Sequence, residues 1–189
     1  YFKKISGKKN QEKIWNSFKN EPPTDITVRD KRDLKKWEKA LGGKQIGLTN
    51  SIRLNKIPKI SEMPGYKEGQ WWVQNFSSSL PVLIMGDINN LEVIDCCSAP
   101  GGKTMQLISG GAKTTSIDRS RKRMEILQQN LKRTMLKSET IVSDIFRFSP
   151  QRRVDAVLLD APCSSTGTLR KNPEIEYLNP ITRIKLLCE

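Results

Sequence analysis

One stretch of the sequence has the residue types of a nucleotide-binding turn. The run Val93–Cys96 has the pattern of an apolar strand, and the small residues of Cys97–Lys103 follow it directly. Two adjacent glycines in this turn, Gly101 and Gly102, let backbone amides approach a ligand closely. A helix that begins there points its positive dipole end and its free amides at the same place. The stretch therefore predicts a site for a ligand of nucleotide size.

The end of this turn, Gly102-Lys103-Thr104, also suggests the phosphate-binding loop of nucleoside triphosphatases. That loop requires a glycine five residues before Gly102, and Cys97 occupies this position. The G-x-G-x-x-G fingerprint of dinucleotide-binding proteins is absent from the same turn. A triphosphatase remains the disfavoured alternative, and a nucleoside held by loop amides and acids is favoured.

Three carboxylates come at or just after the ends of predicted strands. They are Asp118, Asp144 and Asp160, after the predicted strands 114–117, 140–142 and 154–159. In a doubly wound sheet, a carboxylate at the end of the second strand can accept both hydroxyls of a ribose, which suits Asp118. Two alternatives stay open: Asp118 can cap the helix that follows it, and Asp144 can be a turn residue.

The elements that position these groups alternate between strand and helix from Leu91 onward. The predicted order is strand 91–96, a helix after Gly101, strand 114–117, helix 119–134, strand 140–142 and strand 154–159. Such alternation is typical of parallel βαβ units, whose strand ends share one edge of a sheet. We therefore predict an α/β, doubly wound parallel sheet whose last strands are missing from this chain.

The residues before this pattern predict a small basic α+β module. We expect helices over 11–19, 30–41 and 77–85, strands over 24–29, 51–54 and 70–75, and a hinge around 63–75. Trp15 and Trp37 each stand at helical spacing from other apolar residues of their own predicted helix, and both are expected in the core of the module. The module can offer a sheet face and a basic rim to RNA. The predicted domains are 1–86, the RNA-binding module and hinge, and 87–189, the ligand-binding domain.

The charge of the chain indicates a polyanionic partner. The 189 residues carry 33 Lys and Arg against 20 Asp and Glu, a formal net charge of +13. Such an excess favours nucleic acid as the partner, and a lysine-rich solvated surface is the open alternative. No apolar segment approaches the roughly 20 residues of a membrane span, so we expect no membrane partner.

The cysteine and histidine content excludes several kinds of chemistry. Histidine is absent, and the four cysteines, Cys96, Cys97, Cys163 and Cys188, form no CxxC pair. A structural zinc site and a Ser-His-Asp or Cys-His arrangement are therefore not expected, and no metal is predicted. Reduced thiols and a cytoplasmic location follow from the same pattern.

Taken together, the motifs resemble those of one enzyme family. The turn Cys97–Thr104, the acids Asp118 and Asp144, and the segments Asp160–Ser164 and Arg170–Glu174 resemble the RsmB/Sun-type RNA cytosine-5 methyltransferases. These motifs stand in the family order from about residue 69 to 174, and Gly69–Gln74 resembles the segment before the catalytic domain. Where the family commonly has Asp after this glutamine, the chain has Asn75, which affects a local contact.

This resemblance implies a class I, Rossmann-like methyltransferase domain that uses S-adenosylmethionine. Asp118 would contact the ribose, Asp144 the adenine side, and Asp160 would lie between the cofactor and the target base. The turn would surround the methionine part of the cofactor with Cys97, Ser98, Ala99, Pro100, Gly101, Gly102 and Lys103.

The resemblance also explains why a thiol is needed. Carbon 5 of cytosine accepts a methyl group only after a thiolate adds at carbon 6. In the family the cysteine at the position of Cys163 assists release, and the attacking cysteine lies in a later Thr-Cys motif. That motif is missing here, so we expect the main nucleophile beyond Glu189 and regard Cys188 as an ordinary helix residue. The chain therefore has the pattern of a C-terminally incomplete enzyme.

We therefore predict methyl transfer from S-adenosylmethionine to carbon 5 of a cytosine in RNA, most simply ribosomal RNA. The base must be unpaired or flipped out, and Arg170 and Lys171, just after the catalytic turn, are expected to bind the RNA backbone or to form only a solvated turn. The alternative is a catalytically incomplete fragment that binds RNA or cofactor. A monomer is expected.

Overall fold

The computed structural model describes residues 16, 22–55, 59–163, 165, 168, 170–172 and 175. Residues 24–161 form one contact unit, and the described residues outside this range belong to another. The predicted helix 11–19 with Trp15, and Cys188, lie outside the described residues, apart from helical Asn16.

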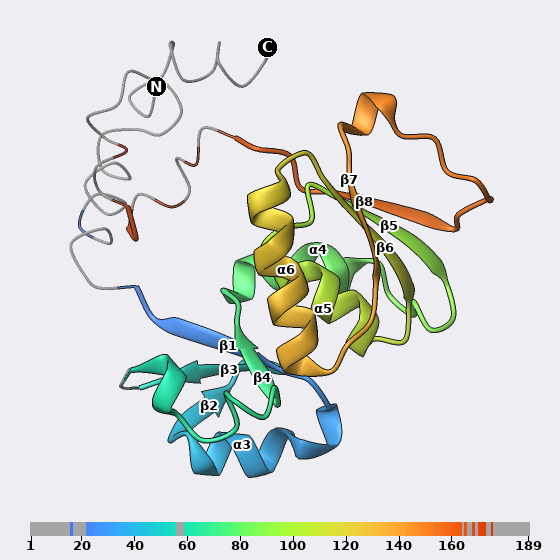
Figure 1. The fold of residues 1–189 in the computed structure, drawn as a ribbon. Coiled ribbons are helices and arrows are strands. Elements are labelled where there is room, and N and C mark those ends of the chain that lie inside the picture. The colour runs from blue at the N-terminus through green and yellow to red at the C-terminus, as the bar shows by residue number, and fades with distance from the viewer. Residues whose placement is uncertain are drawn as a thin grey trace, which may run out of the picture. The chain divides into compact units, whose positions relative to one another are not determined.

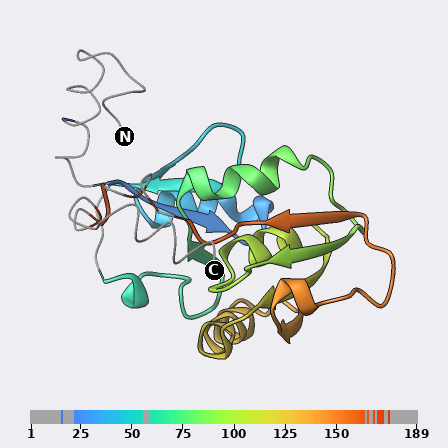
Figure 2. The same ribbon diagram turned by 90° about the horizontal axis from the view of Figure 1, so that it is seen from above.

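A parallel sheet of four strands forms the second half of the larger unit (Figure 1). Its strands are β5 (Glu92–Cys96), β6 (Lys113–Asp118), β7 (Glu139–Val142) and β8 (Ala156–Leu159). They lie in the order β7-β6-β5-β8, with all three pairings parallel, and Figure 2 shows the orange β8 beside the green β5. This is the third-second-first-fourth order of a doubly wound, Rossmann-like sheet, and it confirms the predicted α/β class.

Two helices cover one face of this sheet because each carries a single apolar stripe. They are α5 (Gly102–Ser109) and α6 (Arg121–Thr134). On α6 the buried residues Met124, Leu127 and Leu131 recur at helical spacing and pack with Met105 of α5. The opposite face of the sheet is covered by the segment around η3 (Ile145–Arg147). This second face is covered over β5 to β7, whereas Val157 and Leu159 of β8 are 57% and 59% exposed.

An antiparallel sheet forms the first half of the unit. Its strands are β1 (Thr24–Val28), β2 (Gly43–Gln45), β3 (Ser51–Leu54) and β4 (Trp71–Val73), in the order β2-β3-β1-β4. The short helices η1 (Lys31–Asp33) and α3 (Leu34–Ala40) cover one face, where Trp37 packs among Ile26, Ile52 and Trp71. The core position predicted for Trp37 is confirmed. The strand β2 was not predicted, because three residues without an apolar pattern give no strand signal.

The other face of the antiparallel sheet packs against α5 and α4 (Phe76–Ile84). The Thr27 hydroxyl donates to Gln74 Oε1 at 2.9 Å, and Gln74 Nε2 donates to Gln106 Oε1 of α5 at 2.8 Å. Asp25 accepts the Phe76 amide at 3.1 Å. These side chains are buried, so at β1 and β4 the sheet face that we expected to meet RNA is covered by the neighbouring helices.

The 63–75 segment, which was expected to be a hinge, packs against and hydrogen-bonds to α6. Arg133 donates to the carbonyls of Tyr66 and Trp71 at 2.6 and 3.1 Å, and its guanidinium lies 4.1 Å from the Tyr66 ring centroid. A Cβ at Gly69, where φ is +64°, would lie 2.0 Å from the Arg133 carbonyl oxygen. These contacts hold the 63–75 segment in the same contact unit as the parallel sheet.

In the described part of the chain, no helix has both the length and the apolar character needed to cross a membrane. Nor does any group of three or more Cys, Asp and Glu side chains within the described ranges gather as a metal site would require.

Candidate functional site

The predicted turn joins the carboxyl end of β5 to α5 at the edge where the strand order reverses. Cys97 is left-handed at φ 58°, the Ala99–Pro100 peptide is cis, and Gly101 is left-handed at φ 103°. The amide and hydroxyl of Ser98 both donate to the Ile117 carbonyl of β6, at 3.0 and 3.2 Å. The turn is therefore anchored to the neighbouring strand. In such sheets, ligands bind in the crevice at this edge.

Asp118, at the end of β6, is bonded to the turn itself. Its Oδ2 accepts the Ala99 amide at 3.2 Å and its Oδ1 accepts the Ser120 amide at 2.9 Å. The residue is 2% exposed. The helix cap of α6 is the Ser120 side chain, which accepts the Arg123 amide at 3.3 Å. Asp118 thus holds the turn in place rather than capping α6.

Arg123 of α6 completes this arrangement. Its guanidinium donates to the Ala99 carbonyl and lies 3.5 Å from Asp118 Oδ2. The amide and the carbonyl of Ala99 are therefore both held by side chains from the β6–α6 region. Sequence reasoning missed Arg123, because a basic residue in the first turn of a helix carries no signal of this contact.

The start of α5 is open. The helix has no side-chain cap, so its first amides have no side-chain partner. A Cβ built on Gly102 would meet only the Gln74 side chain, at 3.9 Å. This leaves uncovered amides and room at a helix N-terminus, the arrangement that accepts the polar end of a ligand.

Asp160 and Lys103 form an ion pair above the same edge. Lys103 Nζ lies 2.6 Å from Asp160 Oδ2, with side-chain exposures of 15% and 60%. The Asp160 amide donates to the Cys96 carbonyl at 3.4 Å, so the ends of β8 and β5 are side by side. The structure thus brings Asp160 to the turn as predicted from strand ends.

Asp144 follows β7 at the outer side of the edge. Its Oδ1 accepts the Phe146 amide at 3.0 Å and caps η3, and the residue is exposed. The Ser143 amide donates to the Asp118 carbonyl at 3.2 Å, which places the end of β7 beside that of β6. Asp144 is therefore both a turn residue and a group available at this edge.

Asp95 is a buried acid that sequence reasoning did not single out. It is 1% exposed, and its Oδ2 accepts the Thr104 hydroxyl of α5 at 2.6 Å. Burial raises the pKa of Asp95 from its ordinary 3.8 to about 6. Behind Thr104, Ser116 and Ser138 continue the chain of hydroxyls at 3.4 and 2.8 Å. Asp95 therefore fixes the first turns of α5 from beneath.

The two cysteines near the turn are poor nucleophiles. Burial raises the pKa of the Cys96 thiol to about 11, and burial together with the Asp118 charge raises that of Cys97. Only the thiolate is an effective nucleophile, so neither side chain is activated for attack. This agrees with the strand and turn roles expected for them.

Cys163 belongs to the second contact unit and is described by itself. It is exposed, and its Sγ accepts the Ser165 amide at 3.3 Å. In the same unit, the Lys171 amide donates to the Thr168 carbonyl at 2.8 Å, so Arg170 and Lys171 lie in a turn. Their predicted contacts with RNA stay predictions.

The arrangement suits a nucleoside-bearing ligand. Open amides at the start of α5 and the carboxylates of Asp118, Asp144 and Asp160 lie along one sheet edge. Carboxylates accept hydrogen bonds from the hydroxyl and amino groups of a ligand, and helix amides donate hydrogen bonds to its terminal carboxylate. S-adenosylmethionine carries hydroxyl groups, amino groups and a terminal carboxylate, so the residues present fit it.

A family model described as "16S rRNA methyltransferase RsmB/F" matches residues 82–188. The ribosomal RNA small subunit methyltransferase B of Shewanella oneidensis is 35% identical over 149 residues, covering 76% of this chain and 35% of that protein. That of Cronobacter sakazakii is 32% identical over 146 residues, covering 74% and 34%. The chain spans about a third of the length of these relatives.

Solved structures share the fold. A crystal structure titled PH0851 superposes with a TM-score of 0.84 at 24% identity, over 98% of this chain and 45% of that one. NSun6 from Pyrococcus horikoshii with SFG superposes with a TM-score of 0.70 at 18% identity, over 87% and 69%. Both likenesses support the arrangement of the two sheets.

Proposed function

The chain belongs to the RsmB/F family of 16S rRNA methyltransferases, and from this premise we propose that it serves the transfer of a methyl group from S-adenosylmethionine to carbon 5 of a cytosine in small-subunit ribosomal RNA. One observation carries the proposal: Asp118 of β6 bonds the Ala99 amide of the turn that opens α5. A carboxylate fixed to a turn beside open helix amides is suited to a nucleoside bearing a terminal carboxylate.

In this proposal, different residues of the larger unit bind different parts of S-adenosylmethionine. The turn Cys97–Lys103 and the open amides of α5 hold the methionine end, Asp118 accepts the ribose hydroxyls, and Asp144 lies on the adenine side. When bound, S-adenosylmethionine supplies an activated methyl group on its sulfonium. Asp160, which is paired with Lys103, is proposed to lie beside the target base and to form a hydrogen bond with its edge.

The thiol chemistry is assigned to residues outside the turn. Neither Cys96 nor Cys97 is suited to attack, because both have a raised pKa. Cys163 is exposed and is proposed to assist product release. The attacking cysteine is proposed to lie outside this sequence. The module 1–86 is proposed to contribute to RNA binding, and the domain 87–189 to donor binding.

Isothermal titration with S-adenosylmethionine and with ATP tests the donor site. We expect binding of S-adenosylmethionine and none of ATP, and a loss of roughly tenfold or more in Asp118→Asn, since a charged hydrogen-bond acceptor is removed. Asp87→Asn, an exposed acid in another loop, is the matched control and should bind as the parent chain does. Tight binding of ATP without S-adenosylmethionine would contradict the proposal.

A further inference from the structure

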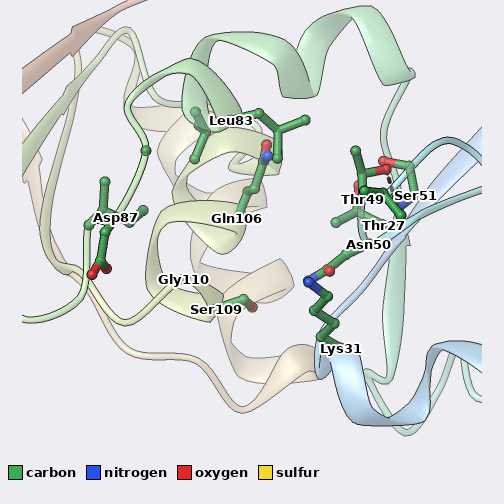
Figure 3. A pocket seen from close by; sticks show the side chains of 14 residues that line it. Thr27, Lys31, Thr49, Asn50, Ser51, Leu83, Asp87, Gln106, Ser109 and Gly110 are labelled. Carbon is green, nitrogen blue, oxygen red and sulfur yellow. Dashed lines mark hydrogen bonds between the residues drawn. The ribbon is translucent and has the colours of Figure 1, made fainter.

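A second cleft lies at the far end of α5 from the donor site. Its volume is about 220 Å³, and it opens between the antiparallel sheet and the helices α4 and α5 (Figure 3). Ser109 and Gly110, at the end of α5, line it, whereas the donor turn precedes the start of that helix. Gln106 also lines the cleft, so its lining on α5 lies about 6 to 12 Å along the helix from Gly102, at 1.5 Å per residue. The cleft is thus distinct from the donor site.

One wall of the cleft carries polar groups without partners. Ser51 is 2% exposed, and within the described ranges its hydroxyl forms no hydrogen bond. The buried Ser109 hydroxyl also lacks a partner among the described residues. Neither the Asn50 carboxamide nor the Lys31 ammonium is bonded to any other described side chain. Buried polar groups are normally paired, so the unpaired hydroxyls of Ser51 and Ser109 beside the cleft indicate a polar occupant, and the more exposed Asn50 and Lys31 are available to it.

The opposite wall is aliphatic. It is formed by Val82 and Leu83 of α4 and by Ile88 in the loop that follows. Gly86 in the same loop has nothing within 4 Å of a built Cβ, which leaves the mouth open. Figure 3 shows Leu83 on the helix side and Asn50 and Ser51 on the sheet side. The cleft therefore offers an apolar surface facing hydrogen-bonding groups.

The charges at the mouth orient an anionic group. Lys31 extends from η1 toward Asn50, and Asp87 lies on the far side of the cleft (Figure 3). Asp87 Oδ1 is occupied by the Asn89 amide at 3.0 Å. An anion is attracted to the Lys31 side and repelled from the Asp87 side. A free phosphate would leave the aliphatic wall unused, whereas a nucleotide uses both walls.

We propose that this cleft binds one unpaired nucleotide of the RNA substrate. Its base lies against Leu83 and Ile88, its edge bonds Asn50 and Ser51, and its phosphate pairs with Lys31. Unpaired bases are recognised by apolar stacking surfaces and by side chains that read their edges. The inference rests on the proposed function, which makes RNA the substrate. It adds a contact through the antiparallel module at the cleft where its otherwise covered sheet face meets α4 and α5.

Fluorescence anisotropy with a short, labelled single-stranded RNA tests the cleft on the whole chain. The double variant Asn50→Leu/Ser51→Val removes the edge contacts without a charge change, and we expect roughly tenfold weaker binding. Lys31→Ala should weaken binding and reduce the salt slope by about one phosphate contact. The control is Lys39→Ala, which removes the same charge from an exposed position of α3 outside the cleft and should reduce RNA affinity less than Lys31→Ala does.

Photo-crosslinking gives an independent readout. RNA containing 4-thiouridine should crosslink to peptides that cover residues 48–51 or 82–88. Crosslinks confined to other peptides, unchanged RNA affinity in the double variant, or no RNA binding by the parent chain would each overturn the inference. S-adenosylmethionine titration on the same samples separates the two proposals, because the cleft variants should leave donor binding unchanged. Failure of the parent chain to bind the donor would count against the proposed function instead.

Discussion

Gln74 of β4 donates its side-chain amide to Gln106 of α5 at 2.8 Å, and this bond ties the antiparallel sheet to the helix that begins at the donor turn. The Gln74 oxygen accepts from Thr27 and from the Trp72 indole, both at 2.9 Å, and Gln106 in turn donates to the Ser79 carbonyl at 3.0 Å. The orientation of both amides is thereby fixed. The antiparallel sheet therefore supports α5, the helix that begins at the proposed donor site.

Replacement of Gln74 should therefore act at a distance. Gln74→Met leaves three buried polar groups without a partner, each of which costs about 1–3 kcal/mol, so we expect the free energy of unfolding to fall by at least about 3 kcal/mol. Urea unfolding measures this. We also expect weaker binding of S-adenosylmethionine, measured by titration well below the unfolding transition. Gln129→Met, at an exposed site on α6, is the control; an equal effect there would refute the proposed support.

Asp95 should make stability depend on pH in an unusual direction. Its pKa is raised to about 6 in the folded chain, so between pH 4 and 6 the folded state binds more protons than the unfolded state. The contribution of Asp95 to the free energy of unfolding is fully present below pH 4. It falls by about 3 kcal/mol as the pH rises to about 6, and it stays constant at higher pH.

Asp95→Asn removes this titration, and the difference between the two proteins isolates it. Relative to the parent chain, we expect Asp95→Asn to gain stability from pH 4 to 6 and to show a constant difference from pH 7 to 8. Urea unfolding at half-unit pH intervals measures the difference. A difference that is independent of pH would show that Asp95 titrates normally.

Gly69 should tolerate no side chain. It has φ +64°, and a Cβ would lie 2.0 Å from the Arg133 carbonyl and 2.5 Å from Thr134 Cα. Gly69→Ala must move α6 or the 63–70 segment, so we expect a loss of more than about 3 kcal/mol. At Gly47 φ is similar, +56°, but a built Cβ has nothing within 4 Å. Gly47→Ala should therefore lose only about 1 kcal/mol of stability, from the left-handed backbone conformation. Equal melting temperatures for the two variants would contradict the packing.

The cysteines should differ in reactivity. Cys163 is exposed, whereas Cys96 is buried with a pKa of about 11 and Cys97 is partly buried with a raised pKa. At pH 8, iodoacetamide should modify Cys163 first, Cys97 slowly and Cys96 only after unfolding. Peptide mass spectrometry follows each site separately. Rapid modification of Cys97 would show an activated thiol in the turn.

Much of the site was predictable because it depends on strand ends. The acids Asp118, Asp144 and Asp160 each follow a run of strand-forming residues, and parallel strands place their carboxyl ends at one edge. The glycines of the turn and the apolar stripe of α6 are local signals of the same kind. Sequence alone thus determined the order of elements from Leu91 onward and the class of fold, and it predicts the sheet edge at which a ligand is held.

The tertiary structure decided which side chains hold that edge together. Arg123 on Ala99, Thr104 on Asp95 and Gln74 on Gln106 join residues 24, 9 and 32 positions apart in the sequence, and none belongs to a local pattern. The covered face of the antiparallel sheet was equally unpredictable, since Thr27 and Ser51 have the polarity of a solvent-facing surface. Hydrogen bonds between distant elements satisfy buried polar groups, and only the packed chain shows which groups meet.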